Sequence, residues 1–554
     1  MHSISFSTKA RRTAIAEVVF LMLSGMSVVD AAAQTVPSPG AVLDSTRSAA
    51  SPIPAPKKES SLVLPAAQDA AALDPNAART QVNAFRIVGN KEIDAATLHG
   101  LIDSEAGKPL NLFELSKIAR VITEFYRSHG FPVARAVIPA QKVENGTVTI
   151  EVIEGRIDRT TFTGNKLYST AFLQRWAAPL IGKTVQVAAL EERVLTLNDL
   201  PGLQTQAVLI PGLEYGTTTT EFLSTEKQYD GEISLNNYGR PEIGRTRIDA
   251  NANLNNPFGI GDQLGVRTSV SEHGLLKLGG INYSLPLDTD GTRLALSYTH
   301  IRYGIGGELA SLDIQGKSQL ASATVIHPFL RSAARNLYGT FAVRSFSGKQ
   351  SALDVELSKS RVSVFEAGAA WNHIDERFNV ATAGMRVSTN FNPYKEEHSN
   401  VGQKFKIDAD ASYLYNLDSS WSVKAAGAAQ WTPDTLADAE KFSLGGPTSV
   451  RGYPSADVRA DRGVFASLEL RYRTQVLGAP GYFSTFVDGG HVSRVEEVEG
   501  LPKSYSIGSA GFGATFFPTR HLQLDLMAGA PTSSLDPSDL RKNGRLWFNL
   551  TTRF

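Results

Sequence analysis

The second half of this chain alternates apolar and polar residues with a period of two, and this pattern restricts the fold more than any other feature. From residue 228 to residue 554, such segments are separated by turns rich in Gly, Asn, Asp and Pro. One segment places Ala466, Leu468, Leu470 and Tyr472 on one face and Ser467, Glu469, Arg471 and Arg473 on the other. A period of two is typical of β-strands whose two faces meet different surroundings.

A soluble sandwich and a membrane barrel both produce this alternation, but a barrel turns its apolar face to lipid and its charged face to a wet lumen. Segments of about 9–12 residues suit a tilted membrane strand. The chain also ends with Leu546, Phe548, Leu550 and Phe554 on one face of its last segment. We therefore predict a transmembrane antiparallel β-barrel over residues 228–554. At roughly 20 residues per strand and connection, it would have about 16 strands.

The N-terminal 33 residues have the pattern of a secretory signal peptide. Lys9, Arg11 and Arg12 supply the positive region, residues 18–29 the apolar region, and residues 31–33 a small-residue cleavage site. Beyond it there is no run of 18 apolar residues, so no helical membrane span is expected. Residues 34–83 are rich in Pro, Ala and Ser and are interpreted as a linker with short helices at 40–51 and 66–74.

Composition and motifs argue against several function classes. Lys+Arg and Asp+Glu are equal at 55 each, which gives no support for a nucleic-acid binder. The chain has no cysteine, so it can form neither a disulfide nor a zinc–thiolate site. Its ten histidines are scattered, and it has neither a P-loop nor a nucleophile elbow. We expect no enzyme activity, no cofactor and no metal.

An internal repeat precedes the barrel region. Gly89-Asn90-Lys91 recurs as Gly164-Asn165-Lys166, and each copy follows a short alternating segment. In the first copy the order is strand, helix, helix, strand, strand. Residues 111–128 carry its clearest helical periodicity, with Asn111 as a candidate cap. We expect two such units, at residues 84–157 and 158–227.

Two short motifs lie within the barrel region. Val450-Arg451-Gly452-Tyr453 is followed by a strand segment that contains Phe486, Asp488 and Gly490. A guanidinium can hold a carboxylate through two parallel hydrogen bonds, and small neighbours leave room for a loop to approach. The pair is compatible with a loop held inside a barrel, and equally with an ordinary surface arginine and a turn aspartate.

These motifs together resemble those of the outer-membrane transporters of two-partner secretion, the TpsB or haemolysin secretion/activation family. Further matches are Phe85 to Asn90, Tyr126 to Phe131, Asn237-Tyr238-Gly239, His327 to Ser332 and Leu444-Gly445-Gly446. The resemblance spans residues 85–554. It implies an α+β part of two periplasmic POTRA domains before a 16-stranded outer-membrane barrel of a Gram-negative bacterium.

The resemblance also implies roles for particular residues. The tip of residues 450–453 would fold back into the lumen, with Arg451 held by Asp488. A helix in residues 34–83 would plug the pore, but the segment 40–51 is short for that task. Independently of the resemblance, Glu469, Arg471 and Arg473 alternate on one strand face and are candidates to line the lumen, although a solvated sheet face explains them equally well. Tyr126, Phe131 and Val133 are candidates for client binding beside an exposed POTRA sheet edge.

Three functions compete at this point. The main hypothesis is a transporter that secretes a partner exoprotein resembling the TpsA clients of this family. It would contact outer-membrane lipid and, during its own assembly, periplasmic chaperones and the barrel-assembly machinery. The alternative is an insertase that assembles other outer-membrane proteins. A passive porin is the third, and the repeat at residues 84–227 argues against it because a porin needs no such units.

Overall fold

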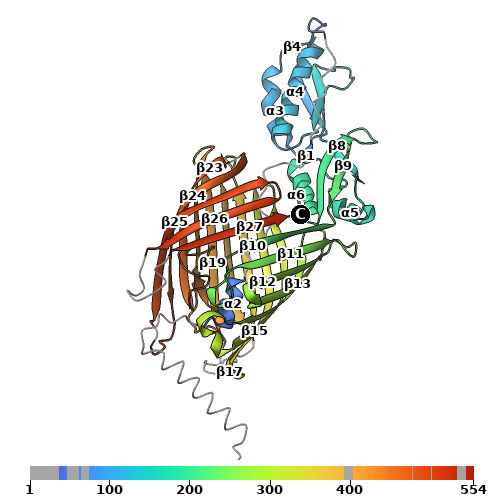
Figure 1. Ribbon diagram of the computed structural model, residues 1–554. Helices are drawn as coiled ribbons and strands as arrows, with labels where there is room; N and C mark the ends of the chain where they lie inside the picture. Colours follow the sequence, from blue (N-terminus) through green and yellow to red (C-terminus); the bar gives the residue numbers. More distant parts are fainter. Residues whose placement is uncertain are drawn as a thin grey trace, which may run out of the picture.

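The computed structural model describes residues 36–46, 62–63, 74–391, 403–476, 478–500, 502–532 and 544–554. The predicted signal peptide and most of the predicted helix 66–74 lie outside these residues. The described chain forms one β-barrel with two small α/β domains stacked at one end of it (Figure 1). We call these repeat domain 1 and repeat domain 2 in chain order.

Sixteen strands, each antiparallel to its neighbours, close into the barrel. They are β10 (Tyr229–Asn236), β11 (Arg247–Asn255), β12 (Gln263–Ser271), β13 (Leu276–Pro286), β14 (Arg293–Gly304), β15 (Ile314–Arg331), β16 (Arg335–Ala352), β17 (Val355–Ile374), β18 (Val380–Asn390), β19 (Phe405–Asn416), β20 (Trp421–Trp431), β23 (Arg462–Val476), β24 (Ala479–Ser493), β25 (Ser504–Thr519), β26 (Leu522–Pro531) and β27 (Arg545–Arg553). Pairing of β10 with β27 closes the ring. The predicted barrel and its 16 strands are confirmed.

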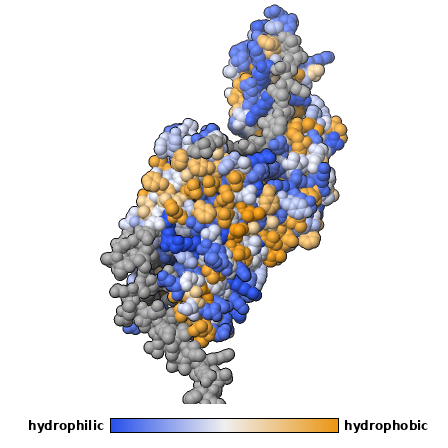
Figure 2. All heavy atoms as spheres, viewed as in Figure 1, coloured by the Kyte–Doolittle hydropathy of each residue, from blue (hydrophilic) through white to orange (hydrophobic). Residues whose placement is uncertain are grey.

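Apolar side chains cover the outside of the barrel and ionic ones lie inside. On β23, Leu468 is 56% exposed although it is apolar, whereas its charged neighbour Glu469 is 8% exposed. Leu546 and Phe554 of the last strand are also exposed. In Figure 2 a hydrophobic band covers the barrel wall on the side of the repeat domains. Such an arrangement is stable only when lipid surrounds the wall and water fills the lumen.

Repeat domain 1 has the predicted order of elements: β3 (Ala84–Val88), α3 (Ala95–Ile102), α4 (Leu112–Ser128), β5 (Arg135–Val137) and β6 (Thr147–Ile153). Its sheet has the order β3-β6-β5, beside the short pair β2 (Thr80–Gln81) and β4 (Pro109–Leu110). Asn111 caps α4 as predicted, because its side chain and that of Glu114 each accept the other's backbone N–H. Leu115, Ile118 and Ile122 of α4 pack toward the sheet.

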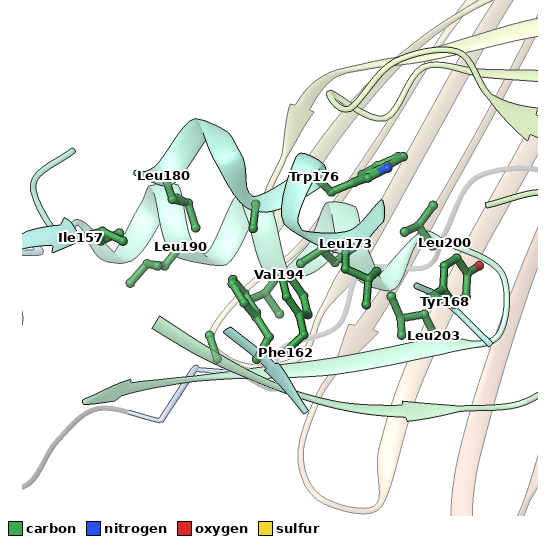
Figure 3. Close-up of a cluster of buried hydrophobic side chains, with 14 of the residues drawn as sticks. Ile157, Phe162, Tyr168, Leu173, Trp176, Leu180, Leu190, Val194, Leu200 and Leu203 are labelled. Atoms are coloured by element: carbon green, nitrogen blue, oxygen red, sulfur yellow. The ribbon is translucent and has the colours of Figure 1, made fainter. Parts of the chain in front are cut away.

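Repeat domain 2 contains β7 (Arg156–Thr163), α5 (Thr170–Ala177), α6 (Val187–Asn198), β8 (Leu203–Pro211) and β9 (Thr217–Glu226). Leu173 and Val194 lie between these helices and the sheet and belong to the buried cluster of Figure 3. The sheet has a fourth strand, β1 (Leu62–Val63), which comes from the segment before repeat domain 1. It pairs in parallel with the outer edge of β8.

No described helix is long and apolar enough to cross a membrane.

The repeated Gly-Asn-Lys sequence marks the same turn in both domains. Gly89 and Gly164 have φ values of +85° and +84°, where a side chain is strained. A Cβ on Gly89 would also overlap the carbonyl oxygen of Val152. The carboxylates of Glu154 and Glu226, at the ends of the last strands, accept backbone N–H groups of these turns. The two copies of the repeat therefore have the same turn geometry, which one glycine and one glutamate stabilise in each copy.

Repeat domain 2 is fixed to the barrel through two arginines. Arg331, at the end of β15, donates from Nε and Nη2 to the two oxygens of Asp199 at 2.7 and 2.8 Å. Arg193 of α6 donates to the carbonyl of Thr289, in the turn after β13, at 2.6 Å. Two parallel bonds from a guanidinium fix direction as well as distance. This junction orients the repeat domains over one mouth of the barrel.

Candidate functional site: the loop in the barrel lumen

The loop of residues 432–461, between β20 and β23, folds back into the barrel. It contains the 3₁₀ turn η6 (Asp438–Glu440) and a hairpin of β21 (Phe442–Leu444) and β22 (Val458–Ala460). Val450 and Tyr453 at its tip are 0% and 2% exposed. They pack with Val492 and Ile507 of β24 and β25. The tip is thus a core element of the lumen, although it belongs to a loop.

Arg451 holds this tip to the barrel wall. Its Nε and Nη2 donate to the two carboxylate oxygens of Asp488 at 2.9 and 2.7 Å, and its backbone N–H donates to Asp488 at 3.1 Å. Its Nη1 donates to Glu469 at 2.6 Å. The structure therefore brings together the two residues that the sequence motifs suggested, and adds Glu469 as a second carboxylate partner.

The wall is shaped to receive Arg451. Its guanidinium carbon lies 3.4 Å from the centre of the Phe486 ring, close enough for a cation–π contact. Ser467 and Ser509 donate hydroxyl hydrogen bonds to Asp488, which is 2% exposed. The indole of Trp547 donates to the carbonyl oxygen of Arg451 at 2.7 Å. The carboxylate and the guanidinium are both satisfied in this position.

Two glycines make the close approach sterically feasible. A Cβ on Gly452 would lie 2.8 Å from the Cβ of Ser509 and 2.9 Å from the backbone nitrogen of Pro531. A Cβ on Gly490 would lie 2.6 Å from a methyl of Leu444 in the loop. Contacts that short force a shift, so a side chain at either position would push the loop away from the wall.

The three residues expected to line the lumen differ in their surroundings. Glu469 belongs to the Arg451 cluster, and Arg471 donates to it at 2.7 Å while lying over the ring of Tyr482. Arg473 lies further along β23, where it is exposed and donates to Asn416 at the end of β19. Arg473 is therefore separate from the loop site.

Sequence reasoning missed a second ionic cluster at the base of the loop. Glu440 of η6 accepts bonds from Arg344 of β16 and forms an ion pair with Lys406 of β19 at 2.9 Å. Asp438, on the same turn, pairs with Arg459 of β22 at 2.7 Å. These residues belong to no motif, and they meet only because the loop lies in the lumen beside the inner faces of β16 and β19.

A short helix, α2 (Pro39–Ser45), lies inside the barrel against this cluster (Figure 1). Ser38 caps it and Pro39 starts it. Arg459 binds Asp44 at 2.8 Å, and Val42 is fully buried among wall side chains. Of the expected helix over 40–51, residues 40–45 are helical, Thr46 is the C-cap, and residues 47–51 lie outside the described residues. Seven residues span only about 10 Å, yet they fill part of the lumen because the loop fills the rest.

A loop and a short helix therefore fill much of the barrel lumen. Among the residues that the structure describes, no three histidine, aspartate or glutamate side chains gather as metal ligands would. A family model described as haemolysin secretion/activation protein ShlB/FhaC/HecB matches residues 223–516, which include the loop and the carboxylates that hold Arg451. This chain belongs to the haemolysin secretion/activation family.

A second family model, the POTRA domain of ShlB type, matches residues 80–155, which make up repeat domain 1. The heme/hemopexin transporter protein HuxB of Haemophilus influenzae (strain 86-028NP) is 26% identical over 489 residues, covering 84% of this chain and 85% of its own. The outer membrane transporter CdiB of Dickeya dadantii is 22% identical over 447 residues, covering 76% and 77%. The solved structure of CdiB from Escherichia coli superposes with a TM-score of 0.70 at 19% identity and covers all of both chains.

Membership of this family places the protein in the outer membrane, with its POTRA domains in the periplasm. The end of the barrel that carries repeat domain 2 is therefore the periplasmic end. The loop of residues 432–461 and helix α2 belong to the opposite, extracellular half. Strand direction agrees, because β20 runs from the periplasmic end to this loop and β23 returns from it.

The residues expected to bind a client in repeat domain 1 are placed differently from the prediction. Tyr126 and Phe131 are 1% and 7% exposed and belong to the domain core. Burial, reinforced by the neighbouring Glu154, raises the pKa of the Tyr126 hydroxyl well above its ordinary value, so the hydroxyl stays protonated and donates to Glu154 at 2.9 Å. Val133 packs against repeat domain 2. In this structure these side chains pack within and between the two domains, and their contact with a client stays a prediction.

Proposed function

We propose that this protein is the secretion pore for a partner exoprotein, which it takes up in the periplasm and passes through the barrel lumen to the cell surface. One observation carries the proposal. A barrel of 16 strands is wide enough for an aqueous channel, and here the lumen is closed by two elements that are not part of the wall. These are the loop tip, held by Arg451, and helix α2, held by Arg459.

Both elements are attached by apolar packing and by polar contacts, without being strands of the barrel wall. The contacts of α2 include Gly40 N–H to Asp438 at 2.7 Å and Arg247 to the carbonyl of Ser45 at 2.7 Å. A helix of seven residues has little stability of its own. Once its side-chain contacts are lost, it can leave the lumen without disturbing the strand ladder of the barrel.

Client capture is proposed to occur by strand addition at repeat domain 2. The edge of β8 accepts an extended chain in parallel register, as its pairing of Ala207 and Val208 with residues 62 and 63 demonstrates for the protein's own segment. Main-chain hydrogen bonds of this kind demand no particular sequence. A client segment could use the same edge after β1 has left it. Because β1 and α2 both belong to the part of the chain before repeat domain 1, client binding at this edge would be linked to the position of α2.

The client is proposed to be a secreted protein exported in an unfolded state. HuxB is named as a heme/hemopexin transporter, and the related HpmB of Proteus mirabilis is named as a hemolysin transporter. No nucleotide-binding motif is present in the sequence. Folding of the client on the far side would prevent its return and so supply the direction of transport.

A reversible tether tests the proposal directly. A Cβ built on Gly348 of β16 lies 2.9 Å from the Cβ of Pro39, and a disulfide needs about 3.5–4.5 Å between these atoms. A shift of less than about 1 Å in α2 would therefore allow Pro39→Cys and Gly348→Cys to bond. The chain has no other cysteine to compete. We expect the oxidised double variant to stop secretion and a reducing agent to restore it.

The two single-cysteine variants serve as controls, and both should secrete under oxidising conditions. Normal secretion by the oxidised double variant would contradict the proposal. The amounts of other outer-membrane proteins should stay unchanged while the tether is closed. A general loss of barrel proteins would indicate the alternative function, an insertase.

A further inference from the structure

A row of basic side chains crosses five neighbouring strands of the barrel. The members, here called the basic row, are Lys277 of β13, Arg302 of β14, Lys317 of β15, Lys349 of β16 and Lys359 of β17. Each is the direct register partner of the next: Lys277 with Arg302, Arg302 with Lys317, Lys317 with Lys349, and Lys349 with Lys359. With about 4.8 Å between strands, the row is about 19 Å wide.

The basic row faces outward. Leu276 and Leu278, on either side of Lys277, are buried inside the barrel in the cluster that surrounds α2. Gln350, next to Lys349, donates to the carbonyl of Pro37 in the lumen. Successive residues of a strand point to opposite faces, so the lysines point away from the lumen. All five members of the row are exposed.

The exposed apolar side chains of the barrel wall, which include Ile281 and Tyr298, are here called the apolar belt. The basic row lies on the extracellular side of this belt. The far end of β15 carries Arg331, which contacts repeat domain 2 in the periplasm. Ile281 and Tyr298 lie four residues nearer the periplasm than Lys277 and Arg302, on the same face, and are 49% and 43% exposed. Four residues of a strand tilted by 35–45° rise by about 10 Å. The row therefore lies just above the hydrocarbon, at the level of the lipid headgroups of the outer leaflet.

The protein itself supplies little negative charge to this row. Among the described residues, Lys349 is the one member with a carboxylate at ion-pair distance, Glu356 at 2.7 Å. Glu272, in the adjoining turn, instead accepts the backbone N–H of Arg245. Like charges directly opposite each other destabilise a sheet. The basic row contains four neighbouring register pairs of like charge. An anion from outside the chain would offset the repulsion within these pairs.

A second tier of donors lies two residues nearer the membrane. Arg361 follows Lys359 on the same face and is exposed. His300 occupies the corresponding position below Arg302, whose Nε lies 2.9 Å from the imidazole Nε2. Gln319 lies below Lys317, with its amide nitrogen 3.5 Å from the other ring nitrogen. Together the two tiers form a cationic surface that ends where the apolar belt begins.

We propose that the basic row binds the phosphate groups of a phosphorylated glycolipid of the outer leaflet, the lipid A part of lipopolysaccharide. The phosphates contact the lysines and Arg302, and the acyl chains lie along the belt that includes Ile281 and Tyr298. A free phosphate ion would use only the first of these two surfaces. Cationic clusters beside a membrane bind anionic headgroups through the same long-range attraction.

The experiment uses the purified full-length protein in a neutral detergent. The ligand is lipid A with two phosphates, and its binding is followed by native mass spectrometry and by the thermal unfolding midpoint. The test variant carries Lys277→Gln, Lys317→Gln and Lys359→Gln. The matched control carries Lys91→Gln, Lys142→Gln and Lys183→Gln, which removes the same charge from exposed lysines of the repeat domains.

We expect the test variant to lose lipid A affinity on the order of a hundredfold, from the typical contribution of each lysine near an anionic headgroup. The control should bind as the parent does, and added salt should weaken parental binding. Without lipid, the test variant should unfold at the same temperature as the parent or higher, because repulsion has been removed. A lower midpoint without lipid would mean that the lysines stabilise the fold itself, and would overturn the proposal.

Two comparison ligands complete the test. Lipid A without its phosphates should bind the parent protein no better than it binds the test variant. Inorganic phosphate at the same concentration should not raise the parental unfolding midpoint. Equal binding of the phosphate-free lipid, or equal stabilisation by inorganic phosphate, would contradict the assignment to a phosphorylated lipid. None of these outcomes depends on whether the protein secretes a partner.

Discussion

Replacement of Arg451 by alanine is the most informative perturbation of the closed pore. It removes three charge-assisted contacts, two to Asp488 and one to Glu469. Loss of one partner from a buried ion pair costs about 3–5 kcal/mol. Asp488 keeps hydrogen bonds from Ser467, Ser509 and the backbone N–H of residue 451. We therefore take the lower end, about 3 kcal/mol of docking free energy for the loop tip.

The population of undocked loop then rises on the order of a hundredfold, since each 1.4 kcal/mol is a factor of ten. Val450→Cys provides the reporter, because Val450 is fully buried and the parent chain has no cysteine. Its labelling rate with a membrane-impermeant maleimide, added to intact cells, measures how often the tip leaves the wall. Arg451→Ala should raise this rate about a hundredfold, up to the limit set by a fully exposed thiol.

Two further variants separate geometry from charge. Arg451→Lys keeps the cation but not the planar pair of donors, so we expect an intermediate rise of about tenfold. Arg471→Ala removes an arginine that also contacts Glu469 but does not touch the loop, and its labelling rate should match that of the reporter alone. If Arg451→Ala labels as slowly as the reporter alone, the arginine does not hold the tip and the reasoning is refuted.

Three other predictions follow from the fold and the plug. Gly89→Ala should destabilise repeat domain 1 by at least about 1 kcal/mol, measured by hydrogen exchange in the full-length protein. Gly100 is a helical glycine with open space around it. Gly100→Ala should therefore stabilise the same domain by about 0.5–1 kcal/mol. Arg331→Gln should break the bidentate contact with Asp199 and broaden the distances between spin labels on repeat domain 2 and the barrel; an unchanged distribution would mean that other contacts fix the junction. Asp44→Asn should weaken the hold on α2 and raise single-channel conductance in planar bilayers, and conductance equal to that of the parent would show that this carboxylate does not retain the plug.

The parts of the fold that follow from short-range patterns could be predicted from the sequence. Period-two alternation is a local property, and it gave the outward position of Leu468 and the inward position of Glu469. The repeated turn at Gly89 and Gly164 is also local, and it identified the two repeat domains. The contact of Arg451 with Asp488 spans 37 residues, and a motif resemblance was needed to suggest it.

The rest depends on which strands become neighbours. Arg459 and Asp44 are 415 residues apart in the chain and meet only inside the closed barrel. The basic row is equally hidden, because Lys317 and Lys349 are adjacent only in the register of β15 with β16. The burial of Tyr126 could not be predicted for a different reason. The sequence places Tyr126 near a predicted sheet edge but does not fix which face of helix α4 carries it. In the structure that face is the buried one, and the Tyr126 hydroxyl donates to Glu154.

An exported polypeptide should pass through the lumen that the loop and α2 close in this structure. The direct measurement is site-specific photo-crosslinking to an exported partner protein, identified from the gene neighbourhood and stalled by a folded C-terminal domain. A photoreactive residue at position 424, which pairs in register with the lumenal Glu469, should crosslink to the stalled chain. The same residue at position 468, which faces lipid, should not. Crosslinks from position 468 and none from position 424 would contradict the account.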